Sequence, residues 1–317
     1  MISPLDVIHS VLPIYLLILS GAILRRLNII QPSFDEGIMR VVYSVMLPAF
    51  MIDKILGSPV LKSSSVIASS IILGFSLILI CVACSAALGR ILGLERGSGL
   101  RTFALSAGSQ NFGFTAAPVV QILWPTATLS VLFIHNIGVE LAMWSVGVMI
   151  MAGSNGIIWK KLLNGPVFAV CFSLTLIACG WDHLLDGPIR STISMIGVGA
   201  FPLAILITGC TIMDLMTAKK PNLKIILGAS AIRLFIAPAV FLSAAYFLPL
   251  SPELKQVLVV QAAMPAAMTP IMLARLYGGQ PAIAVQVVVF TTALSLISLP
   301  IIIALGCKWL NLLPILP

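Results

Sequence analysis

Long runs of apolar residues, separated by short polar or basic stretches, follow one another along the whole chain. No charged residue stands between Lys62 and Arg90, or between Arg275 and Lys308. A helix that crosses the hydrocarbon core of a bilayer needs about 20 mostly apolar residues, and the runs reach this length. The pattern predicts ten membrane-spanning helices, at residues 7–24, 38–58, 65–88, 100–123, 128–150, 163–181, 191–213, 223–248, 254–277 and 281–306.

Composition points to the same class of protein. Of the 317 residues, 60% are hydrophobic and 9% are charged, and the mean hydropathy is +1.13, whereas an average soluble domain has roughly 25% charged residues. These values exclude a soluble globular domain and a disordered chain. The net charge of +8 is not gathered into runs of like charge, so we expect a lipid bilayer and no nucleic acid as partner. The sequence therefore predicts an all-α polytopic membrane protein.

Lysine and arginine residues indicate how the spans are oriented, because they accumulate in cytoplasmic loops. If the N-terminus lies outside, the loops on the cytoplasmic side hold twelve of these residues and the other side holds five. We therefore expect a protein of the inner membrane with both termini on the non-cytoplasmic side.

Similar features recur after a shift of about 154 residues, because Pro48 then falls on Pro202 and Asn111 on Pro265. This recurrence predicts two five-helix repeats, 1–150 and 163–317, joined by a cytoplasmic linker at 151–162. Since five is odd, the second repeat has the inverted topology, and inverted repeats with broken helices are typical of secondary transporters. Coincidence is the alternative, because proline is common in membrane helices.

The fourth and ninth spans are interrupted by polar residues, glycine and proline in the middle of the membrane. Proline removes a helical hydrogen bond, and backbone groups freed in this way cannot face lipid. The ends of the resulting half-helices carry partial charges that suit an anionic group or a cation. The pattern predicts substrate-binding residues Gln110, Asn111, Gln261 and Thr269, in a site shaped by Gly113, Pro118, Pro265 and Pro270. The alternative is that the amides only hold neighbouring helices together.

Two charged residues lie near the middle of spans, Glu140 in the fifth and Arg233 in the eighth. Charges at this depth are costly and usually have a function. Two interpretations stay open: a buried ion pair between these side chains, and a role in proton coupling or in neutralising the substrate. The chain has no familiar catalytic or Walker motif, so we expect neither an enzyme nor a primary pump. We also expect no metal site and no cofactor, apart from H⁺ or Na⁺ as a coupling ion.

At the two interrupted spans the chain resembles the auxin efflux carrier family, within a wider group that includes the bile acid:sodium symporters. The fourth span has the family's Asn followed seven residues later by Pro, here Asn111 and Pro118. The ninth span matches the family's pattern at Gln261, Ala262, Ala263, Pro265, Pro270, Ala274, Arg275, Tyr277 and Pro281. The resemblance implies a fold in which spans four and nine cross at their breaks. Spans one, two, six and seven would form a scaffold, and the others a mobile transport domain.

The resemblance also implies a function, namely secondary active transport of a small organic anion by elevator-type alternating access. The linker 151–162 is short, as in bacterial members, whereas the plant carriers have a long hydrophilic loop. We therefore expect the substrate to be a small organic anion, namely a mono- or dicarboxylate, rather than auxin. The alternatives are sodium-coupled uptake of an organic anion, as in the bile acid symporters, and, in other classes, a channel or an intramembrane enzyme. The sequence is compatible with a homodimer.

Overall fold

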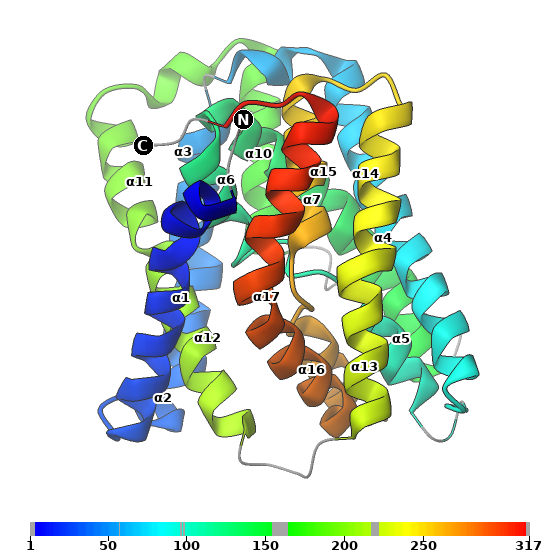
Figure 1. Cartoon of the computed structure of the whole chain (residues 1–317). Coiled ribbons are helices and arrows are strands. Elements are labelled where there is room, and N and C mark those ends of the chain that lie inside the picture. The colour runs from blue at the N-terminus through cyan, green and yellow to red at the C-terminus, as the bar shows by residue number, and fades with distance from the viewer. Residues whose placement is uncertain are drawn as a thin grey trace.

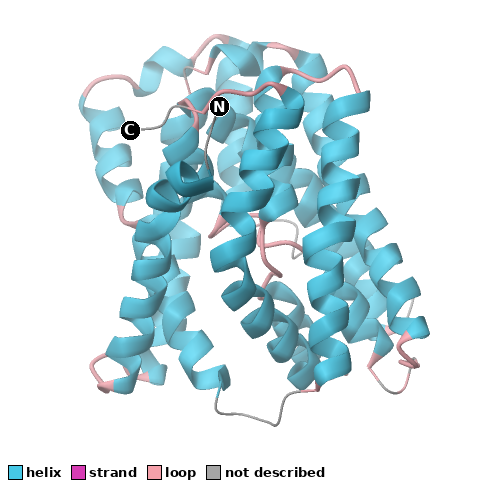
Figure 2. Ribbon diagram, in the orientation of Figure 1, coloured by secondary structure: helices cyan, strands magenta, loops and turns pink. Residues whose placement is uncertain are grey.

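A computed structural model of the chain describes residues 4–56, 58–95, 97, 99–153, 164–216 and 222–314. In this part of the chain the regular structure is helical (Figures 1 and 2). The α-helices are α1 (Pro4–Arg26), α2 (Pro32–Val41), α3 (Leu47–Ile55), α4 (Ser64–Ile91), α5 (Leu100–Gly108), α6 (Ala116–Leu123), α7 (Thr126–Ala142), α8 (Val148–Ala152), α10 (Gly165–Cys179), α11 (Pro188–Val198), α12 (Ala200–Met216), α13 (Leu223–Ala231), α14 (Ala237–Phe247), α15 (Pro252–Ala263), α16 (Thr269–Leu276) and α17 (Pro281–Leu310).

Short helical turns connect several of these helices. Three π-helical turns continue α2 into α3, α7 into α8 and α13 into α14, at Val42–Met46, Met143–Gly147 and Ile232–Ile236. Two 3₁₀ turns, Pro59–Lys62 and Asp182–Leu185, lie in connecting segments. Most of the predicted linker, 151–162, lies outside the described residues.

The described residues contain six helical stretches that are long and apolar enough to cross a membrane. They are Val7–Arg26, Ser64–Ile91, Thr126–Ala152, Pro188–Asp214, Leu223–Phe247 and Pro281–Leu310. The chain is therefore a multi-pass membrane protein. The other four predicted spans correspond to shorter or divided helices: α2 with α3, α5 with α6, α10, and α15 with α16. The count of ten spans and the inverted repeat stay predictions.

Glycines allow two pairs of long helices to pack with their backbones in contact. A Cβ atom at Gly74 of α4 would lie 2.0 Å from the carbonyl oxygen of His135 in α7, and one at Gly138 of α7 would lie 2.0 Å from that of Ile71. Gly21 of α1 meets α12 in the same way. Close approach through small residues is the usual basis of helix association in membranes.

The first and the last helix of the bundle, α1 and α17, run in opposite directions. Figure 1 shows that α1 begins and α17 ends at the same end, whereas α1 ends and α17 begins at the other. The breaks between α5 and α6 and between α15 and α16 form loops inside the bundle, at mid-height in Figure 2. The interrupted segments are therefore surrounded by other helices rather than exposed to lipid.

Candidate functional site

The two interrupted segments meet at their breaks and satisfy each other's backbone groups. The amide of Asn111 donates a hydrogen bond to the carbonyl of Pro265 (2.7 Å), and the amide of Ala267 donates to the carbonyl of Ser109 (2.9 Å). These bonds form a short antiparallel bridge between Gln110 and Ala266. Backbone groups in the middle of a membrane need such partners, because no water is present to replace them.

The prolines lie where the second half-helices begin. Pro118 is in the first turn of α6 and Pro270 is the second residue of α16. In the first turn, the amide that proline lacks would have no partner within the helix. We expected these prolines to interrupt continuous helices, whereas in the structure α5 and α15 end several residues earlier. Pro265 lies in the break itself, where its carbonyl accepts the bond from Asn111.

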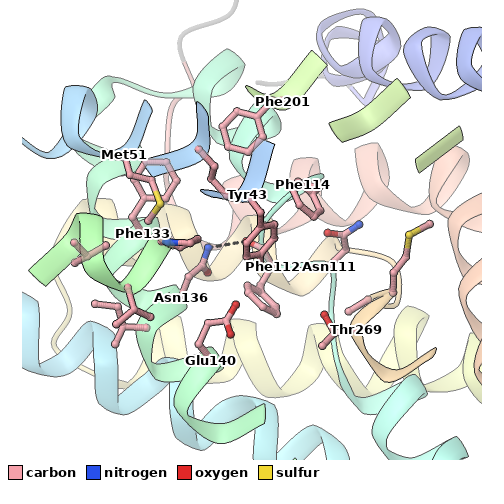
Figure 3. Close-up of a pocket in the computed structure, with 18 of the residues that line it drawn as sticks. Tyr43, Met51, Asn111, Phe112, Phe114, Phe133, Asn136, Glu140, Phe201 and Thr269 are labelled. Carbon is pink, nitrogen blue, oxygen red and sulfur yellow. Dashed lines mark hydrogen bonds between the residues drawn. The ribbon is translucent and has the colours of Figure 1, made fainter. Parts of the chain in front are cut away.

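A cavity of about 90 Å³ lies beside this bridge (Figure 3). A single water needs roughly 10–15 Å³ of such space, and a cavity of about 150 Å³ binds benzene, so this cavity has room for several waters or for a molecule smaller than benzene. Its walls come from both breaks and from α3, α7, α10 and α12. The lining residues are Tyr43, Leu47, Met51, Asn111, Phe112, Gly113, Phe114, Phe133, Asn136, Ile137, Glu140, Pro166, Val167, Val170, Phe201, Thr208, Ala267, Met268 and Thr269.

Two of the four predicted substrate-binding residues, Asn111 and Thr269, line this cavity from opposite breaks. The side-chain amide of Asn111 donates to the hydroxyl of Thr115 (2.8 Å), and its oxygen accepts from the amide of Thr115 (3.4 Å). Asn111 therefore stabilises the turn that leads into α6, and keeps one N–H for a ligand. The hydroxyl of Thr269 forms no hydrogen bond with any residue that the structure describes.

Gln110 and Gln261, the other two predicted residues, are buried and do not line the cavity. The amide nitrogen of Gln261 donates to the side-chain oxygen of Asn136 (3.3 Å) and, at 3.5 Å, to the carbonyl of Phe112. Asn136 also donates to that carbonyl (2.9 Å). Gln261 thus positions Asn136, which lines the cavity. Both polar atoms of the Gln110 amide lack a partner among the described residues.

Glu140 and Arg233 do not form the ion pair that the sequence analysis considered. Within the described residues, the carboxylate of Glu140 accepts a hydrogen bond from the indole of Trp144 (2.6 Å) and lines the cavity. The guanidinium of Arg233 donates to the carbonyl of Gly108 (3.0 Å) at the C-terminal end of α5. That end of a helix carries a partial negative charge. A helix terminus, rather than a carboxylate, is therefore the partner of this buried cation.

Aromatic residues distant in sequence complete the cavity, and no pattern in the sequence indicates them. Tyr43 stacks edge-to-face with Phe114, with ring centroids 5.8 Å apart. Phe50 makes the same kind of contact with Phe133 and Phe201, which both line the cavity. Asn136, four residues before Glu140 on α7, lies on the same face of this helix and also lines the cavity.

The arrangement suits an anion with an apolar body. The residues just before α6 and α16 line the cavity, so the N-terminal ends of both half-helices, which carry partial positive charge, are directed towards it. The hydroxyl of Thr269 and the free N–H of Asn111 add hydrogen-bond donors. The aromatic rings provide an apolar surface that excludes water. No lysine or arginine lines the cavity.

The chain is similar in sequence to known membrane transport proteins. The model of a family described as "Membrane transport protein" matches residues 6–158 and 154–303. Auxin efflux carrier component 7 of Arabidopsis thaliana is 33% identical over 153 residues, which are 45% of this chain and 23% of that protein. Components 1 and 3 of the same plant are 31% and 30% identical over similar stretches. The match thus spans about a quarter of the length of these curated relatives.

The family match covers nearly the whole chain, and the relatives agree with the resemblance seen at the interrupted spans. The family is one of membrane transporters and not of enzymes. The chain therefore belongs to the membrane transport protein family, which includes the auxin efflux carriers.

Proposed function

We propose that this transporter is a secondary carrier of a small organic anion across the inner membrane. The observation that carries this proposal is the convergence of two half-helix N-termini, Asn111 and Thr269 on one aromatic cavity. The helix termini would bind a carboxylate, and Tyr43, Phe112 and Phe114 would contact its apolar part. Because the cavity has no basic side chain for a second carboxylate, a monocarboxylate is favoured over a dicarboxylate.

An elevator movement is supported by the way the helices group. α1 packs against α12, and α10 and α11 pack against α3. Separately, α4 packs against α7 and α5, while α14 and α17 pack against α15. The cavity lies between these groups, with walls from α3, α10 and α12 on one side and from α7 and both breaks on the other. A sliding of the second group along the first would carry the bound anion across the membrane, in ten spans arranged as two inverted repeats.

We propose that transport is coupled to protons and that Glu140 binds the coupled proton. Its carboxylate lies in the same cavity as the anion, so two negative charges would repel each other there. Protonation of Glu140 removes this repulsion and would accompany binding of the substrate. Tyr43 is the other titratable group that lines the cavity. Sodium is the alternative coupling ion.

A binding screen tests the proposed substrate class. Monocarboxylates and dicarboxylates would be titrated by calorimetry against the purified protein, with and without sodium. We expect a small monocarboxylate to bind, and Thr269→Val to weaken its binding roughly 10- to 100-fold, since a hydrogen bond to a charged group contributes about 1.5–3 kcal/mol. Thr175→Val on α10 is the control, because Thr175 is exposed and its hydroxyl bonds only to its own helix. Equal binding by the Thr269→Val protein would show that this residue is not part of the site. In a separate measurement, a substrate flux that does not saturate with concentration would indicate a channel.

A further inference from the structure

A second, larger groove lies between α1 and α12 on one side and α16 and α17 on the other. Its volume is about 850 Å³, which is within the roughly 300–1,000 Å³ of ligand sites. The lining is almost entirely apolar and includes exposed Leu16 and Leu19 of α1 and exposed Phe290 and Leu296 of α17. Both helices are apolar enough to cross a membrane. In a bilayer this groove is therefore accessible to hydrocarbon chains.

Arg275 lies at one end of the groove, in the last turn of α16. It is exposed and forms no ion pair or hydrogen bond with any residue in the described part of the chain. Two other polar side chains of the lining are already engaged: Gln286 accepts a hydrogen bond from the amide of Asn222 (2.8 Å), and Tyr15 donates to Ser295 (3.1 Å). The groove thus combines a long apolar wall with one uncommitted cation at its end.

We propose that this groove binds one anionic phospholipid, with an acyl chain between α1 and α17 and the phosphate at Arg275. A guanidinium can bind a phosphate through two parallel hydrogen bonds. The part of α17 that lines the groove, Pro281–Leu296, is about 22 Å long. Half of the hydrocarbon core is about 15 Å thick. The groove therefore accommodates the chain of a lipid from one leaflet, and the remaining length brings the headgroup to Arg275.

A contact between α1 and α17 lies towards the far end of the groove. The hydrogen bond between Tyr15 and Ser295 joins α1 to α17 there, next to Leu296 in the lining. An acyl chain that enters beside Arg275 would extend along the apolar wall towards this contact. Such a site differs from the ordinary lipid around a membrane protein, because both an anionic phosphate and the groove itself contribute to binding. The proposal does not depend on what the protein transports.

Photocrosslinking tests the site. The full chain would be reconstituted in nanodiscs that contain phosphatidylglycerol with a photoactivatable acyl chain, or diacylglycerol with the same label. Peptide mapping should locate the phosphatidylglycerol adduct on α1 and α17. Arg275→Gln should reduce this adduct roughly 10-fold or more, in line with the loss of a charge-assisted hydrogen bond. Arg26→Gln, an exposed arginine at the end of α1 and outside the groove lining, should leave it unchanged.

A second pair of variants tests the apolar part. Ala293→Trp fills the groove and should abolish the adduct, whereas Ile297→Trp, exposed on the same helix but outside the lining, should not. The diacylglycerol adduct should be weak and unaffected by Arg275→Gln. Equal labelling of all four variants, or labelling spread over other helices, would overturn the proposal and indicate ordinary surrounding lipid. Labelling that depends on Ala293 but not on Arg275 would overturn the assignment of the phosphate.

Discussion

In the proposed proton coupling, the charge of the cavity changes with pH through Glu140. Its carboxylate bonds to the indole of Trp144 and lines the same space as Asn136. A negative charge at this position opposes the binding of an anion. Protonation removes that charge, so substrate binding by the native protein should be stronger at low pH than at high pH.

Glu140→Gln keeps the size of the side chain and removes its titration. We expect this variant to bind substrate with an affinity that is nearly independent of pH, because the amide is neutral at every pH tested. Uptake into proteoliposomes driven by a pH gradient should be lost, while binding survives. Glu253→Gln, a substitution in the first turn of α15 outside the cavity lining, is the control. A pH dependence of binding that persists in Glu140→Gln would assign the proton to another group.

At the scale of single residues, the sequence predicted which side chains are unusual but not where they point. Asn111 and Thr269 line the cavity, whereas Gln110 and Gln261 turn into the protein. Gln110 and Asn111 lie in the irregular segment between α5 and α6, which has no fixed periodicity, so their directions cannot be read from spacing. Glu140 and Arg233 were considered as a pair because both are buried charges. The C-terminal end of α5, which binds Arg233, is created by the break, and the sequence does not show that this end lies beside Arg233.

At the scale of helices, glycine contacts hold α4 against α7. A Cβ atom at Gly74 would lie 2.0 Å from the carbonyl oxygen of His135, and this backbone cannot yield without moving the helix. Gly37 of α2, in contrast, has open space around a Cβ atom. Replacement of glycine by alanine should therefore affect the stability of the protein differently at the two positions.

Gly74→Ala should lower the free energy of unfolding by about 1–3 kcal/mol, the usual effect of overpacking. Gly37→Ala should be neutral or stabilise by up to about 1 kcal/mol, because alanine favours the helix. Thermal unfolding of the two variants in the same detergent measures the difference. A Gly74→Ala protein as stable as the native one would show that α4 and α7 can separate at little cost.

The helix breaks were predictable from proline and glycine, but their mutual pairing was not. The bonds of Asn111 to Pro265 and of Ala267 to Ser109 connect segments more than 150 residues apart. Such pairing depends on how the whole bundle brings the breaks together. The aromatic lining has the same origin, because Tyr43 and Phe201 come from helices whose own sequences carry no sign of a cavity.

At the scale of the whole molecule, basic residues favour one end of the bundle. Arg25 and Arg26 end α1, and Arg90 lies in the last turn of α4 and Arg275 in that of α16. The loops that contain or follow these residues lie at one end in Figure 1, opposite to the connection between α10 and α11. Since Lys and Arg accumulate on the cytoplasmic side, we propose that this end is cytoplasmic and that α1 begins outside.

Cysteine labelling tests this orientation. Gly97→Cys lies between α4 and α5 and Asp186→Cys between α10 and α11; both positions are exposed, and a Cβ atom at Gly97 has open space. The background would lack the six native cysteines, of which Cys171 and Cys179 are exposed. An impermeant maleimide should label Asp186→Cys in intact spheroplasts and Gly97→Cys only in inverted vesicles. Labelling of both positions from one side would contradict the arrangement of the helices, whereas labelling from exchanged sides would keep the fold and reverse the orientation, with both termini then in the cytoplasm.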